Sequence, residues 1–95
     1  MLCLSREKGA GVIIGDKEVT LEILEVFSTF VIFALSRKNG HSEIVTLYGL
    51  GSRMDLIDGI SITFISKRDK YARLGFKGDR RLKILRSEKF SYEAS

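Results

Sequence analysis

The side chains of this sequence best suited to binding chemistry are basic, and they gather towards its C-terminal end. The 95 residues include 16 Lys and Arg against 12 Asp and Glu, a net charge of +4. Residues 66–89 alone carry ten basic and three acidic side chains. Such a block attracts a polyanion, although a solvated basic surface has the same composition. The charge is consistent with nucleic-acid binding but is not sufficient to establish it.

Side chains that usually carry catalysis or hold metals are scarce. Cys3 lies between two leucines, as a small buried strand residue does, and His41 follows Asn-Gly in a predicted turn. One cysteine and one histidine form neither an internal disulfide nor a four-ligand zinc site. Asp16 and Asp58 fall in predicted turns, which explain them better than acid–base catalysis. We therefore predict a protein that is not an enzyme and has no cofactor.

Alternation of apolar and polar residues predicts the elements that position the basic side chains. Residues 18–23, 60–64 and 71–76 alternate with period two, the pattern of strands with one buried face. Residues 30–35 are apolar throughout and predict a central strand between two layers. Short turn signals separate these runs, and only residues 87–94 could form a turn or two of helix. We expect an all-β fold, a small antiparallel barrel or sandwich of about nine short strands.

Length and hydrophobicity limit the class of protein. A chain of 95 residues is expected to form one domain. The longest apolar run, residues 30–35, is far shorter than the roughly 20 residues that cross a bilayer, and the first residues do not resemble a signal peptide. We expect a cytoplasmic protein with no membrane partner.

An internal repeat organises the chain. Residues 19–25 align with residues 60–66 at a shift of 41, and the same shift places residues 31–35 on residues 72–76. With small insertions, residues 12–16 align near 55–59, and residues 44–48 near 82–86. The repeats cover about residues 1–48 and 49–90, although similarity between amphipathic strands also arises by chance. Residues 44–53 must serve as the last strand of the first repeat, as a linker, or as a degenerate first strand of the second repeat.

The sequence also resembles a known family. Residues 1–9 (MLCLSREKG) and 12–16 (VIIGD) resemble the amino-terminal signature of the carbon storage regulator family, small bacterial RNA-binding translational regulators. The second half resembles the rest of that family in residues 57–59 (IDG), 60–65 (ISITFI), 72–76 (ARLGF) and 82–88 (LKILRSE). The resemblance implies two interlocked five-stranded copies, whose RNA sites each combine the first strand of one copy with the last strand of the other. This chain would then be a fused pseudo-dimer, monomeric rather than homodimeric.

The resemblance implies one retained RNA site that binds GGA-containing loops of messenger leaders or small RNAs. Leu4 would pack against a base, Ser5 would add a hydroxyl, and two arginines would bind phosphate or a guanine edge. Two further basic residues would add phosphate contacts. The complete set is Leu4, Ser5, Arg6, Arg81, Lys83 and Arg86. A core leucine and solvated basic residues are the ordinary interpretation of the same positions.

Departures from the family pattern leave an alternative open. Glu7 stands where the family commonly has a second arginine, and Leu85 stands where it commonly has a histidine. Tyr48 aligns with Arg86, so the second site is expected to be degenerate. The alternative function is a protein-binding module that has kept the fold, has lost RNA recognition and pairs with another regulator.

Overall fold

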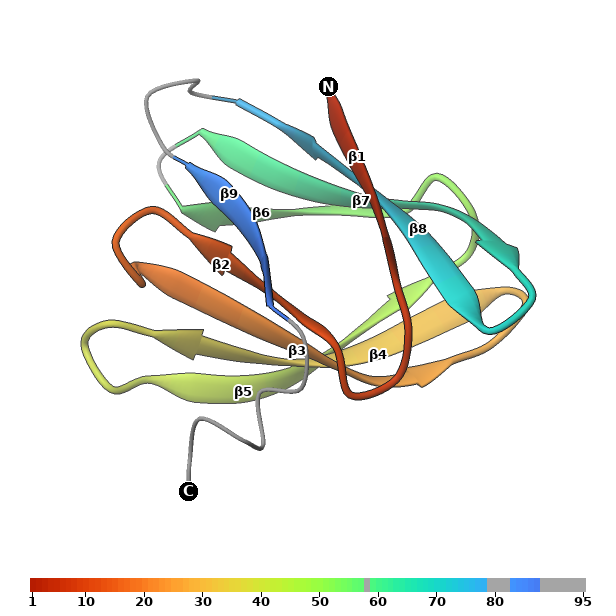
Figure 1. Ribbon diagram of the computed structural model, residues 1–95, viewed down its shortest axis with the longest axis horizontal. Helices are drawn as coiled ribbons and strands as arrows, with labels where there is room; N and C mark the ends of the chain where they lie inside the picture. Colours follow the sequence, from red (N-terminus) through yellow and green to blue (C-terminus); the bar gives the residue numbers. More distant parts are fainter. Residues whose placement is uncertain (58, 79–82, 88–95) are drawn as a thin grey trace.

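Two antiparallel β-sheets pack face to face in the computed structural model, which describes residues 1–57, 59–78 and 83–87 (Figure 1). The four-stranded sheet has the order β1 (Leu2–Arg6), β8 (Tyr71–Lys77), β7 (Ile60–Arg68) and β6 (Arg53–Ile57). The five-stranded sheet has the order β5 (Ser42–Tyr48), β4 (Phe30–Arg37), β3 (Val19–Val26), β2 (Gly11–Ile14) and β9 (Ile84–Ser87). The predicted all-β fold of nine strands is confirmed.

The structure contains no helix among the described residues, so none there could span a membrane. The short C-terminal helix considered for residues 87–94 falls almost entirely on residues 88–94, which lie outside the described part of the chain. Its first residue, Ser87, is the last residue of β9.

The core lies between the sheets and follows the predicted alternation. Val19, Leu21 and Ile23 of β3 are fully buried, as every second residue of a strand with one covered face must be. The central strand β4 has β3 and β5 on its two sides, as expected, but only every second residue is fully buried. Its other side chains are half-buried because they lie on the outer face of the sheet. The expected second layer is therefore missing there among the described residues.

The repeat recurs in the strand register. Ile23 lies opposite Phe33 in the first half, and Phe64 lies opposite Leu74 in the second, a shift of 41 on both strands. Both ladders then slip by one residue, between Ile23 and Glu25 and between Phe64 and Ser66. A β-bulge at the same place in both hairpins is specific local geometry. The two halves therefore share their fold in detail.

The alignment of residues 44–48 with residues 82–86 is wrong. The second of these segments includes β9, which pairs with β2, whereas β5 pairs with β4. Val45 lies opposite Phe33 just as Leu4 lies opposite Leu74, so β5 is the counterpart of β1 at the same shift of 41. Tyr48 is consequently not the counterpart of Arg86. Short strands with alternating apolar and polar residues can be aligned with one another in several ways. Only the strand with which each of them pairs shows which alignment is correct.

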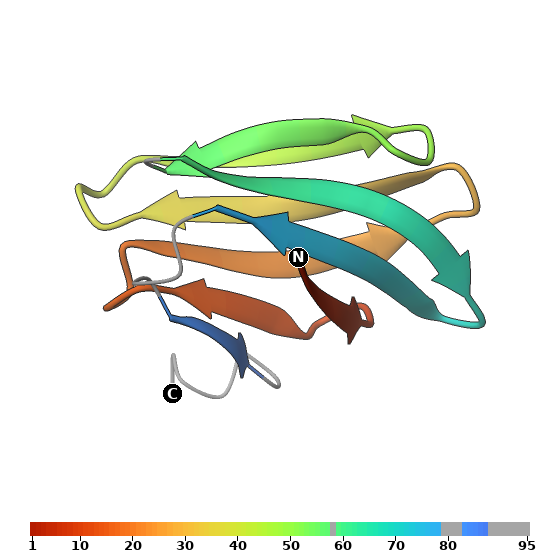
Figure 2. The same ribbon diagram turned by 90° about the horizontal axis from the view of Figure 1, so that it is seen from above.

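The outermost strands lie on two opposite sides of the sandwich. In the view of Figure 2, β1 and β9 lie in the lower part of the molecule, at one edge of each sheet, and β5 and β6 lie at the top, at the other edges. The first and last strands thus belong to different sheets but share one side of the molecule.

Candidate nucleic-acid interface

One side of the sandwich is formed by β1 and β9, the first and last strands of the described chain. Strand β1 pairs only with β8, and β9 only with β2, among the described residues. An edge strand presents backbone N–H and C=O groups that no neighbouring strand satisfies. Two such edges on one side offer a row of donors and acceptors to a ligand (Figure 1).

Strand β1 divides its predicted site residues between the two faces of the sheet. Leu4 lies opposite Leu74 and belongs to the hydrophobic core, with 6% of its surface exposed. Arg6 is also buried, with 6% exposed, and Ser5 between them is exposed. Successive strand residues point to opposite faces, which explains the division. Among these three side chains, Ser5 is the one that reaches solvent freely.

The guanidinium of Arg6 connects β1 with the other sheet. Its Nε donates to the carbonyl of Ser5 at 2.8 Å, and its Nη1 donates to the carbonyl of Gly11 at 3.4 Å. Gly11 lies opposite Ser87 in the ladder between β2 and β9. A buried charge is tolerated when hydrogen bonds satisfy it, and backbone carbonyls do so here. Arg6 therefore joins the β1 edge to the place where β9 ends.

Strand β9 supplies the exposed basic side chains of the site. Arg86 lies opposite Val12, one residue from the pair of Gly11 and Ser87. Arg86, Leu85 and Lys83 are all exposed, and the carbonyl of Lys83 accepts a hydrogen bond of 2.7 Å from the N–H of Gly15. This bond extends the pairing between β2 and the β9 segment by one residue. The sixth predicted residue, Arg81, lies outside the described residues.

One further basic residue joins this site and was missed by the sequence analysis. Arg73 on β8 lies directly opposite Ser5, and both side chains are exposed. Side chains directly opposite each other in an antiparallel pair lie on the same face about 5 Å apart. The alternation of residues 71–76 placed Arg73 on the outer face, but nothing local showed that this face lies beside β1.

Ion pairs neutralise the charges that follow β1. Lys70 Nζ lies 3.0 Å from Glu7 Oε2, and Lys8 Nζ lies 2.7 Å from Glu25 Oε1. The hydrogen bond to Glu7 and its negative charge hold the pKa of Lys70 above the ordinary lysine value. Glu7, which replaces the expected second arginine, thus engages a basic residue of the C-terminal block. Lys83, Arg86 and Arg73 take part in no ion pair within the described residues.

The opposite side of the sandwich does not reproduce this arrangement. Val45, Thr46 and Leu47 occupy the positions in β5 that Leu4, Ser5 and Arg6 occupy in β1. In the described part of the chain, no strand lies beside β6 as β9 lies beside β2. The two halves therefore provide one such combination of edges. A comparison of β1 with residues 43–47 at the same shift would have shown from sequence that the arginine is missing.

The described residues contain no group of three or more His, Cys, Asp or Glu side chains arranged to hold a metal ion. Comparison with protein-family models, with curated proteins and with solved structures finds no match for this chain.

Proposed function

We propose that this protein is a cytoplasmic, RNA-binding translational regulator of the carbon storage regulator type. Its target is a GGA-containing loop in a messenger leader or a small RNA, and it binds that loop on the side formed by β1 and β9. The resemblance of residues 1–16 and 57–88 to that family supports the proposal. The shared side of the two edge strands supports it independently (Figure 2). Protein bound to a messenger leader would sterically exclude the ribosome from it.

The observation that carries the proposal is the link from Arg6 to Gly11. Because Gly11 lies opposite Ser87, this hydrogen bond ties the first strand to the strand pair that holds Arg86. Two edges from different sheets are thereby held as one surface. Unpaired RNA bases are commonly recognised by such exposed backbone groups together with a few basic side chains.

The geometry changes the roles expected for two residues. The side chains of Leu4 and Arg6 are buried, so β1 would contribute its backbone edge there, and Arg6 would act as a positioning residue. Ser5, Arg73, Lys83 and Arg86 are exposed and would contact the RNA directly. Phosphate contacts would provide affinity, and backbone groups together with Arg86 would read the bases.

The decisive experiment is a titration of the full chain with an RNA hairpin whose loop contains GGA. The matched control is the same hairpin with CCA in the loop, in moderate salt, where nonspecific electrostatic binding is weakened. We expect clear preference for GGA. Equal binding of both loops would mean diffuse electrostatic attraction and would overturn the proposed recognition.

A second candidate function, a protein-binding module without RNA recognition, is favoured by one observation. Glu7 is engaged with Lys70, and this removes positive charge at the end of β1. If neither hairpin binds at any accessible concentration, this module becomes the better account.

A further inference from the structure

Among the residues that the structure describes, the four-stranded sheet has no counterpart of β9, the strand that completes the other sheet. In the five-stranded sheet, β9 lies along β2, with Ile84 opposite Ile14 and Arg86 opposite Val12. Strand β6 is the counterpart of β2, because Ile57 lies opposite Ile60 as Ile14 lies opposite Val19. Within the described residues, β6 pairs only with β7. The repeat thus leaves an open strand position beside β6.

The inward face of β6 lacks the charges that commonly keep another chain from pairing, although the strand has a bulge and the exposed charges of Arg53 and Asp55. The sequence contains no proline, and the inward side chains of β6 are the half-buried Met54 and the buried Leu56, neither of them charged. Inward-facing charged side chains and prolines commonly prevent an exposed edge strand from pairing with another chain. A bulge between Asp55 and Ile57 interrupts the strand, which leaves a regular stretch at Arg53–Asp55. The inward surface of this edge is apolar and already in contact with the core.

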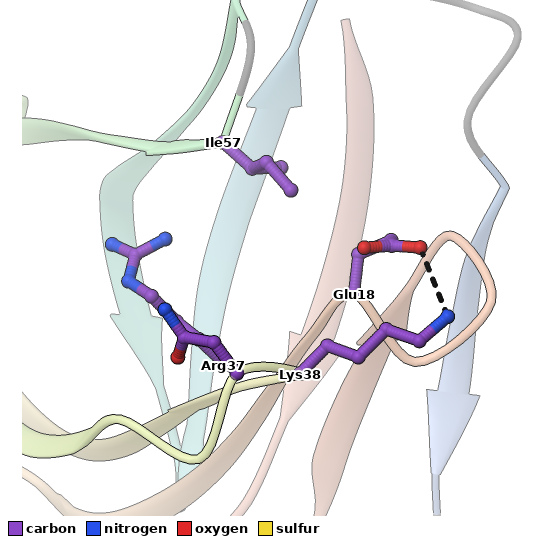
Figure 3. A pocket seen from close by; sticks show the side chains of 5 residues that line it. Glu18, Arg37, Lys38 and Ile57 are labelled. Carbon is purple, nitrogen blue, oxygen red and sulfur yellow. Dashed lines mark hydrogen bonds and ion pairs between the residues drawn. The ribbon is translucent and has the colours of Figure 1, made fainter.

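An open hollow of about 380 Å³ lies at the C-terminal end of β6 (Figure 3). It is lined by Glu18, Arg37, Lys38, Asn39 and Ile57. The guanidinium of Arg37 donates to the carbonyl of Leu56, and Lys38 Nζ lies 3.4 Å from Glu18 Oε1. Two cationic side chains and one carboxylate therefore line the hollow, which has a net positive charge.

The repeat indicates where a strand added beside β6 would lie relative to the hollow. Strand β9 begins at Ile84, opposite Ile14, and Ile57 is the counterpart of Ile14. A strand that paired with β6 in the same way would begin beside Ile57, with its preceding residues at Arg37 and Lys38. Because Arg37 and Lys38 are positively charged, acidic residues are favoured at that place in the incoming segment.

We infer that the free edge of β6 accepts an extended segment of a partner protein as a fifth strand. The segment runs antiparallel to β6, alternates apolar and polar residues as β9 does, and is preceded by acidic residues that face Arg37 and Lys38. Its backbone supplies the ladder hydrogen bonds, and its apolar residue at the place of Ile84 covers Ile57. The proposed RNA surface lies on the opposite side, so this site is separate from it and independent of it (Figure 2).

The test is an NMR titration of the isotope-labelled full chain with a synthetic peptide. The peptide carries Leu-Lys-Ile-Leu-Arg-Ser, the sequence of residues 82–87, preceded by two glutamates. We expect amide shifts concentrated at residues 53–57 and at Arg37. A control peptide with proline at the place of Leu85, whose backbone N–H faces β2 in the β9 ladder, lacks a ladder donor and should bind at least about tenfold more weakly. A peptide with two lysines in place of the glutamates should also bind more weakly, by a margin that narrows with salt.

Variants of the chain test the same edge. Met54→Lys places a charge on the inward side of β6 and should abolish peptide binding, whereas Leu2→Lys at the corresponding inward position of the β1 edge should leave it unchanged. Circular dichroism checks that both variants fold. If Met54→Lys does not fold, the proline peptide still decides, since it leaves the protein unaltered.

Three results would overturn the inference. Shifts concentrated at residues 11–14 would mean that the peptide displaces the chain's own β9. Equal affinity of the original and proline peptides would exclude strand pairing. Shifts absent from residues 53–57 at millimolar peptide would show that the edge is closed. None of these results bears on the RNA titration, which reports on the other side of the molecule.

Discussion

Leu47 occupies the place in the five-stranded sheet that Arg6 occupies in the four-stranded sheet. Leu47 lies opposite Val31, and Arg6 lies opposite Ala72, which is 41 residues further along the chain than Val31. Both side chains are buried, with 5% and 6% of their surfaces exposed. One sheet thus has a hydrogen-bonding cation where the other sheet has an apolar residue. The difference makes the two sides of the sandwich chemically unequal.

Replacement of Arg6 should destabilise the protein. Arg6→Ala removes a buried side chain and its hydrogen bonds to the carbonyls of Ser5 and Gly11, so the free energy of unfolding should fall by about 1–3 kcal/mol. Urea unfolding followed by circular dichroism measures the change. The exposed Arg73 provides the control, since Arg73→Ala should change stability by no more than about 0.5 kcal/mol. Equal effects of the two variants would show that Arg6 has no structural role.

Loss of Arg86 should weaken specific RNA binding. Arg86→Ala removes an exposed charge on β9 and should cost about 1–3 kcal/mol in binding to the GGA hairpin, with little effect on CCA. Lys67→Ala, one strand beyond β8, should cost less and should mainly reduce the salt dependence, by about 0.7 per lost phosphate contact. Tyr48→Ala on the opposite side should have no effect. Equal losses on both hairpins for Arg86→Ala would place the specific site elsewhere.

The chain should be monomeric at micromolar concentration. Strands β1 and β9 complete the two sheets from within one chain, so a second copy is not needed to build the β1 and β9 side. Light scattering should give a mass near 10.7 kDa. A stable mass of twice that value would contradict the pseudo-dimer hypothesis, and the RNA proposal would then need a site shared between chains.

The ion pair between Glu7 and Lys70 should respond to alkaline pH. Its pairing raises the pKa of Lys70, so any stabilisation is present below the ordinary pKa of lysine and is lost as the pH rises through the raised value. In Glu7→Gln, NMR titration of the Lys70 side chain should show its pKa shifted back towards the ordinary value. An unchanged pKa of Lys70 would mean that the contact does not persist in solution.

The sequence by itself determined the strands and the repeat. Alternation at residues 19–23 and 60–64 is a local pattern whose period matches the strand, so the buried faces of β3 and β7 followed directly. The same pattern repeats at a shift of 41, and the two hairpins have a bulge at corresponding positions. Among the described residues near the C-terminal end, the predicted site residues Lys83 and Arg86 are both exposed, and Arg86 lies on β9.

Only the tertiary structure decided how the strands combine. The pairing of β5 with β4 and of β9 with β2 depends on contacts between distant segments, and short amphipathic strands match one another too readily for sequence to choose. The burial of Arg6, the neighbourhood of Ser5 and Arg73, and the open edge of β6 all follow from those pairings. Which strand lies at an edge is a property of the whole sheet, because each strand's exposure is set by its neighbours and not by its own residues.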